Sequence, residues 1–161
     1  WDQIQGYIQK GIDEGARLVA GGLGLPEGMN KGFYVRPTIF ADVTPNMRIA
    51  REEVFGPVLS IISFTDEADA VRIANDAAYG LVAGVWTKDM SRALRMAKVL
   101  KVGTVWVNTY RSYSYMVPFG GVKRSGIGRE NGIEAIDAYL ETKSVFIPTA
   151  ERAPANVFVM R

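Results

Sequence analysis

The segment that decides the fold lies at residues 58–86, which read VLSIISFTDEADAVRIANDAAYGLVAGVW. Residues 58–64 form a nearly continuous apolar run, which is typical of a strand covered on both faces. Thr65 is expected to cap a helix whose first turn is acidic, because the helix dipole favours anions there. Small apolar residues then recur at helical spacing up to Gly80, and residues 81–86 resume an apolar run. The segment therefore predicts a strand, a helix and a second strand.

The same alternation continues to residue 108. Asp89 is expected to cap a second helix that ends before Gly103, and residues 103–108 read as the next strand. Strands joined by helices pair in parallel through right-handed crossovers, so we expect an α/β fold with a mostly parallel sheet and flanking helices. Ligands in such sheets bind at the carboxyl ends of the strands, which points to residues 108–119.

Hydrophobic spacing and turn residues predict further elements on both sides of this segment. They are helices over 4–12, 46–52 and 129–139, and strands over 16–20, 38–43, 142–147 and 156–160.

Composition and charge exclude several classes of protein. Of 161 residues 48% are apolar and 22% charged, and Lys plus Arg number 19 against 17 Asp plus Glu. There is no basic block and no apolar run of ~18 residues, so we expect neither a nucleic-acid nor a membrane partner and predict a cytoplasmic location. The chain has no Cys and no His, which removes disulfides, thiol nucleophiles and the commonest general base.

Two adjacent acids, Glu52 and Glu53, precede a Phe55-Gly56-Pro57 turn at the entrance of a predicted strand. Most acid pairs are simply solvated. However, acids at a helix C-terminus oppose the helix dipole at a cost of ~0.3–1 kcal/mol each. A carboxylate beside an aromatic ring can accept two hydrogen bonds from a diol while the ring packs on a flat heterocycle. Those are the requirements of a nucleotide's ribose and base.

Glycines and aromatic residues are concentrated between residues 110 and 130. Residues 119–130 can form either a tight packed turn or a set of exposed backbone groups that face a ligand. The aromatic residues upstream suit an apolar cleft about as well as a core. An earlier glycine cluster at 21–24 has no helix after it and is interpreted as a surface connection.

Four segments together resemble the NAD(P)-dependent aldehyde dehydrogenase family. They are residues 52–58, 79–87, 103–108 and 118–130, in the family's order and approximate spacing. The resemblance covers residues 1 to about 147. Over this range the chain is similar to the C-terminal third of such an enzyme, in particular of members like betaine aldehyde dehydrogenase. It implies part of a catalytic domain over 1–139, an oligomerisation strand over 140–150, and a tail over 151–161.

The resemblance also implies roles for single residues. In that family a Cys thiolate attacks the aldehyde, hydride passes to nicotinamide, and a Glu-activated water hydrolyses the thioester. With NAD or NADP as cofactor, Glu53 is placed on the nicotinamide-ribose hydroxyls and Phe55 near the nicotinamide ring. Other matched positions are Tyr113 and Phe119 as walls of the aldehyde pocket, Tyr110 and Arg111 as their neighbours, Glu130 in a proton relay, and the Lys123 and Gly126 carbonyls as ligands of a monovalent cation.

The chain departs from the family pattern because it lacks the residues that carry out the reaction. The nucleophilic Cys, the general-base Glu and the dinucleotide-binding half are expected upstream, so this chain alone should not oxidise aldehydes. We therefore expect a fragment that works with the missing N-terminal part in a homo-dimer or homo-tetramer. Its aldehyde is expected to be aryl or amino in character. A non-catalytic oligomerisation module and an unrelated nucleotide-binding domain remain as alternatives.

Overall fold

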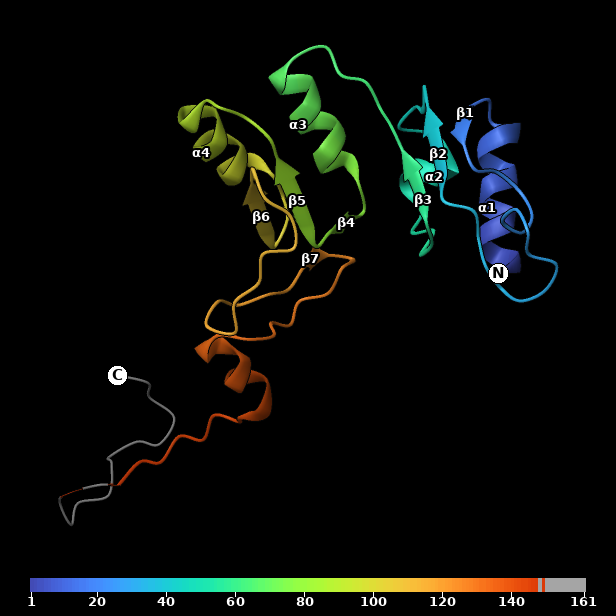
Figure 1. The fold of residues 1–161 in the computed structure, drawn as a ribbon. Helices are drawn as coiled ribbons and strands as arrows, with labels where there is room; N and C mark the ends of the chain where they lie inside the picture. The colour runs from blue at the N-terminus through green and yellow to red at the C-terminus, as the bar shows by residue number, and fades with distance from the viewer. Residues whose placement is uncertain (148, 150–161) are drawn as a thin grey trace.

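The computed structural model describes residues 1–147 and 149, and places them in two groups of elements (Figure 1). The first group, here called the N-terminal unit, spans residues 1–64. It contains α1 (Asp2–Asp13), β1 (Arg17–Ala20), β2 (Thr38–Ala41), α2 (Arg48–Arg51) and β3 (Val58–Ser60). The second, called the C-terminal unit, spans residues 65–147. It contains α3 (Glu67–Asp76), β4 (Tyr79–Gly80), β5 (Val82–Val85), α4 (Met90–Val99), β6 (Thr104–Val107), β7 (Val122–Lys123) and the 3₁₀ helix η1 (Ile133–Tyr139).

The N-terminal unit has a three-stranded sheet in the order β1-β2-β3. β1 and β2 are antiparallel, whereas β2 and β3 are parallel, with Thr38 opposite Val58. Ile8 of α1 and Phe40 of β2 are fully buried and form one core with Ile49 of α2. This shared core fixes α2 against the sheet and so sets the direction in which the chain leaves α2.

The C-terminal unit is built around the parallel pair β5 and β6, which run in register from Val82 opposite Thr104 to Val85 opposite Val107. Figure 1 shows α3 and α4 beside this pair. At the carboxyl ends of the two strands, the Asn108 amide donates to the Thr87 carbonyl and accepts the Thr87 N–H, both at 2.8 Å. β4 and β7 form a separate antiparallel pair below them. The loop after β6 is thereby anchored where a site was predicted.

The α/β class is confirmed, and β5 and β6 pair in parallel as predicted, but the prediction that the strand at residues 58–64 joins the same sheet is wrong. The sheets are small and mixed, and β3 pairs with β2 instead of β5. β3 also ends at Ser60, and Leu59 is 56% exposed, so it is not covered on both faces. An apolar run predicts that a strand forms, whereas its pairing depends on which sheet edge lies beside it. Residues 61–66 carry the chain away to α3 (Figure 1).

Several predicted boundaries also differ from the structure. Asp66, not Thr65, caps α3 by accepting the Asp69 N–H at 2.8 Å. The predicted helix over 129–139 is only the 3₁₀ helix η1, because Asn131 and Gly132 have left-handed φ angles of 60° and 66°. The predicted helix over 46–52 shortens to α2.

Near the C-terminus, the strand predicted over 142–147 is not observed. Residues 141–147 are exposed and pair with no strand among the described residues, and a strand needs a neighbouring edge to form. The oligomerisation segment therefore stays a prediction. The strand over 156–160 and the tail over 151–161 lie outside the described residues.

Candidate active site

The two adjacent acids after α2 have different environments. Glu52 accepts hydrogen bonds from Arg48 Nε and Nη2, both at 2.8 Å, and from the Tyr7 hydroxyl at 2.7 Å. The bonds from Arg48, and after them the bond from Tyr7, lower the pKa of the Glu52 carboxyl to about 2. Glu52 is therefore a structural acid that ties α2 to α1.

Glu53 has the opposite character. Among the described residues, no hydrogen bond or ion pair involves its carboxylate. It lies at the edge of a cavity of about 360 Å³ whose other wall belongs to the C-terminal unit. That wall includes Tyr79, Gly80, Leu81, Val82 and Ala83 from β4 and β5, with Ala74 and Ala77 beside them and Ser125 beyond. Its two oxygens are thus free to accept hydrogen bonds from a molecule in the cavity.

Phe55 follows in a tight turn. Its φ angle is 52°, a left-handed conformation that is uncommon for an aromatic residue, and its side chain is 86% exposed. The ring is therefore held outward by the backbone and is not part of the core. Strained backbone that presents a side chain to solvent is frequent at ligand sites.

A second group of predicted residues gathers around Trp106 of β6. The Trp106 ring makes T-shaped contacts with Tyr110 and with Tyr113, each at 5.4 Å between centroids, and Tyr113 contacts Phe119 at 5.1 Å. The Trp106 indole N–H donates to the Ser112 carbonyl at 2.9 Å, which holds the loop against the strand. These rings form an aromatic wall, defined here as Trp106, Tyr110, Tyr113 and Phe119.

Arg111 and Glu130 lie beside this aromatic wall. The Arg111 guanidinium stands 5.5 Å from the centroid of the Tyr110 ring, and its backbone has a φ of 55°. Glu130 pairs with Phe119 through two backbone hydrogen bonds of 2.7 Å, so it is fixed across from that ring while its side chain is exposed. A cavity of about 290 Å³ opens among Trp106, Tyr113 and Phe119.

The structure thus brings five predicted residues together and leaves Glu53 and Phe55 apart from them. No hydrogen bond or aromatic contact joins those two residues to the aromatic wall within the described part of the chain. Trp106 is a residue that sequence reasoning missed. It was assigned only to a strand, although its place at the carboxyl end of β6 was the available signal.

Lys123 has a structural contact that was not predicted. Its ammonium donates to the Asn75 and Ala77 carbonyls at 2.9 Å each, and so satisfies the end of α3, where the helix dipole favours a cation. The Gly126 N–H donates to the Lys123 carbonyl at 3.4 Å. A monovalent cation held by the Lys123 and Gly126 carbonyls remains a prediction. In the described residues no group of three or more acidic, His or Cys side chains could hold a metal.

Comparison with known proteins decides the family. Residues 1–145 match the sequence profile of the aldehyde dehydrogenase family. The chain belongs to the aldehyde dehydrogenase family. This confirms the family that the four sequence motifs indicated, and it removes the alternative of an unrelated nucleotide-binding domain.

Similar aldehyde dehydrogenases come from several bacteria. Betaine aldehyde dehydrogenase of Brucella melitensis is 51% identical over 91% of this chain and 30% of its own length. An aldehyde dehydrogenase of Mycobacterium tuberculosis, complexed with NAD⁺, has a TM-score of 0.86 at 49% identity, over 94% of this chain and 31% of its own. The aldehyde dehydrogenase of Bartonella henselae has a TM-score of 0.84 at 53% identity, over 88% and 30%. The chain therefore spans about 30% of the length of these relatives.

No helix among the described residues is both long enough and apolar enough to cross a membrane.

Proposed function

We propose that this chain forms the nicotinamide-binding edge and one wall of the aldehyde pocket of an NAD-dependent aldehyde dehydrogenase, which oxidises an aldehyde to a carboxylic acid. One observation carries the proposal. Of two adjacent acids, Glu52 is fully engaged within the protein, whereas Glu53 is unengaged and lines a cavity. An acid that no fold contact requires, at the position where the family motif needs one, is suited to a ligand.

The residues present fit the redox end of NAD⁺. A carboxylate has two oxygens and can accept both hydroxyls of a ribose diol. The exposed ring of Phe55, two residues further on, can pack on a flat heterocycle. Bound NAD⁺ would accept the hydride, and the work of Glu53 and Phe55 is to hold its reactive ring still. Misplacement by ~1 Å can lower a rate ~10²-fold.

The aromatic wall would hold the aldehyde. The T-shaped contacts fix Tyr113 against the buried Trp106 and Phe119 against Tyr113, so the rings would exclude water from one side of the substrate. Aromatic faces attract aryl groups and organic cations. We therefore propose an aldehyde with an aryl or amino group. The name of the relative from Brucella melitensis, betaine aldehyde dehydrogenase, agrees with the second of these.

The remaining predicted roles concern proton transfer and ion binding. The Glu130 backbone is fixed opposite Phe119, and its exposed carboxylate can pass a proton between the pocket and solvent. A cation at the Lys123 and Gly126 carbonyls would stabilise the turn that follows β7. Both roles belong to the proposal.

The nucleophile must come from elsewhere in the enzyme, because these 161 residues contain no Cys. We propose that the chain corresponds to the C-terminal share of its relatives. Sequencing the reading frame on both sides of the chain tests this: we expect a Cys and a general-base Glu to be encoded before Trp1. If they are encoded after Arg161, the chain corresponds to an earlier share.

The Glu53→Gln substitution in the complete enzyme tests the cofactor role. A neutral amide keeps one acceptor but loses the charge, so we expect KM for NAD⁺ to rise about tenfold, equivalent to ~1.4 kcal/mol. Glu52→Gln is the matched control, since it removes a neighbouring acid of the same size. It should reduce thermal stability and leave KM for NAD⁺ near the wild-type value. Equal KM values for wild type and Glu53→Gln would contradict the proposal.

A non-catalytic oligomerisation module remains the second candidate. It is favoured by residues 141–147, which are exposed and unpaired within the described chain. A complete enzyme that assembles normally but shows no NAD⁺-dependent oxidation of any aldehyde would support the module.

A further inference from the structure

One polar contact links the two units of the chain. Among the residues that the structure describes, the bond between Arg51 and Asp76 is the only hydrogen bond or ion pair that joins residues 1–64 to residues 65–147. Arg51 ends α2 and Asp76 ends α3. The contact therefore joins the last residues of two helices that belong to different units.

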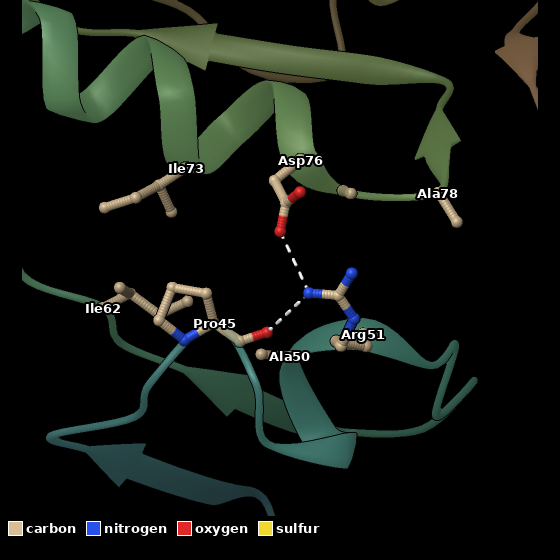
Figure 2. Close-up of a pocket in the computed structure, with 8 residues that line it drawn as sticks. Pro45, Ala50, Arg51, Ile62, Ile73, Asp76 and Ala78 are labelled. Carbon is tan, nitrogen blue, oxygen red and sulfur yellow. Dashed lines mark hydrogen bonds and ion pairs between the residues drawn. The ribbon is translucent and has the colours of Figure 1, made fainter.

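The Arg51 side chain is held from two directions. Its Nη1 donates to Asp76 Oδ2 at 2.9 Å and to the Pro45 carbonyl at 3.1 Å. Figure 2 shows the guanidinium between these two acceptors, with α2 on one side and α3 on the other. Apolar residues line the rest of the junction between the two units, here called the seam. They are Pro45, Ala50 and Ile62 from the N-terminal unit, and Ile73, Ala77 and Ala78 from the C-terminal unit. Apolar contacts have no preferred direction, whereas the hydrogen-bonded ion pair does.

The same seam borders the cavity next to Glu53. Arg51 lies two residues before Glu53 in the chain. The Glu53 carboxylate belongs to the N-terminal unit, but the wall opposite it belongs to α3, β4 and β5. Ala77 lines both the seam and the Glu53 cavity. A shift along the seam would therefore change the distance between Glu53 and the opposite wall.

We infer that Arg51 and Asp76 are positioning residues, whose ion pair sets the place of the Glu53 carboxylate relative to the wall formed by β4 and β5. The inference rests on the proposed function, because it assigns the pair an effect on NAD⁺ binding. Both side chains are 49% exposed, so the pair contributes little to overall stability. The effect of the pair is on the distance between Glu53 and the wall formed by β4 and β5.

Asp76→Asn and Arg51→Ala in the complete enzyme test the inference. We expect each to raise KM for NAD⁺ about five- to tenfold, less than the ~10²-fold effect that a 1 Å misplacement can have on a rate. KM for the aldehyde and the thermal unfolding midpoint should stay near the wild-type values. The double variant should be no worse than the more affected single variant, since both changes break one contact. Arg51→Lys, which keeps the charge, should have a smaller effect than Arg51→Ala.

The Arg17–Asp42 ion pair supplies the matched control. It is also exposed, with a distance of 2.7 Å, but both partners lie in the N-terminal unit. Arg17→Ala should leave KM for NAD⁺ unchanged. An equal rise in Arg17→Ala would show that the effect is a general consequence of losing a surface charge.

Two results would overturn the inference. If Asp76→Asn has wild-type kinetics while Arg51→Ala raises KM for NAD⁺, Arg51 contacts the cofactor directly. If both variants have wild-type kinetics while Glu53→Gln does not, the seam does not position Glu53, although the proposed function stands. Failure of the proposed function itself would appear as wild-type kinetics for Glu53→Gln.

Discussion

At the scale of single residues, neighbours in the sequence have separate tasks. Glu52 is bonded to Arg48 and Tyr7, while Glu53 faces a cavity without a bonded partner in the described chain. A short helix that ends between two units can direct one side chain inward to the protein and the next outward to a ligand. Glu52 therefore stabilises the contact between α1 and α2, whereas Glu53 remains available to a molecule in the cavity.

The low pKa of Glu52 predicts a pH-dependent stability. The carboxyl pKa falls from 4.5 to about 2 on folding, so the folded state is stabilised above pH 4.5 and loses this contribution as the pH falls toward 2. Glu52→Gln lacks this contribution. We therefore expect wild type to exceed Glu52→Gln in urea midpoint at pH 6, with the difference shrinking as the pH approaches 2.

Glu53→Gln is the control for this titration, because its carboxylate has no bonded partner among the described residues. Its urea midpoint at pH 6 should match that of the wild type. A difference between wild type and Glu52→Gln that stays constant with pH would contradict the assignment of the low pKa.

At the scale of elements, close backbone approach decides which substitutions the fold accepts. Gly103 begins the turn into β6, and its N–H donates to the Gly80 and Leu81 carbonyls at 3.1 and 3.2 Å. A Cβ at Gly103 would overlap the Gly120 carbonyl and approach Gly121. This packing sets the segment after Phe119 against β6, so an element contact supports the aromatic wall.

Two glycine substitutions should therefore have opposite effects. Gly103→Ala would be destabilising by ~1–3 kcal/mol through overpacking. Gly6→Ala, in the exposed middle of α1 where a Cβ has no neighbour within 4 Å, should be stabilising. Its expected gain is up to ~1 kcal/mol from helix propensity. Urea denaturation measures both effects. Equal stability of the two variants would contradict the close approach of Gly103 to Gly120.

At the scale of the whole molecule, much apolar surface is uncovered. Trp86 is 65% exposed and Phe64 is 62% exposed, and both line a cavity of about 590 Å³ beside α3, α4 and β5. No residue of α3 is buried, although small apolar residues recur along it at helical spacing. Each Å² removed from water contributes ~25 cal/mol, so this surface favours association.

The isolated chain should therefore self-associate. We expect the mass measured by light scattering to increase with protein concentration. The Phe64→Gln/Trp86→Gln variant should reduce this increase, whereas Lys88→Gln, at an exposed polar position nearby, should not. A monomeric mass at every concentration would contradict the prediction.

The sequence by itself determined the local features and the family. Asp89 caps α4 as predicted, accepting the Arg92 N–H at 3.1 Å, because a cap depends only on residues three positions away. The aldehyde dehydrogenase motifs could also be recognised from the sequence, since each is a contiguous segment. Their roles at Glu53, Phe55, Tyr113 and Phe119 remain proposals.

Only the tertiary structure decided the pairing of β3 with β2 and the Arg51–Asp76 contact across the seam. It also decided that Glu52 is hydrogen-bonded within the protein while Glu53 lines a cavity. Each of these joins residues that are distant in the chain. Periodicity indicates that a strand or helix forms and which face is apolar, but it carries no information about which partner lies opposite. That choice is made when the units pack and each polar group either finds a bond or faces a cavity.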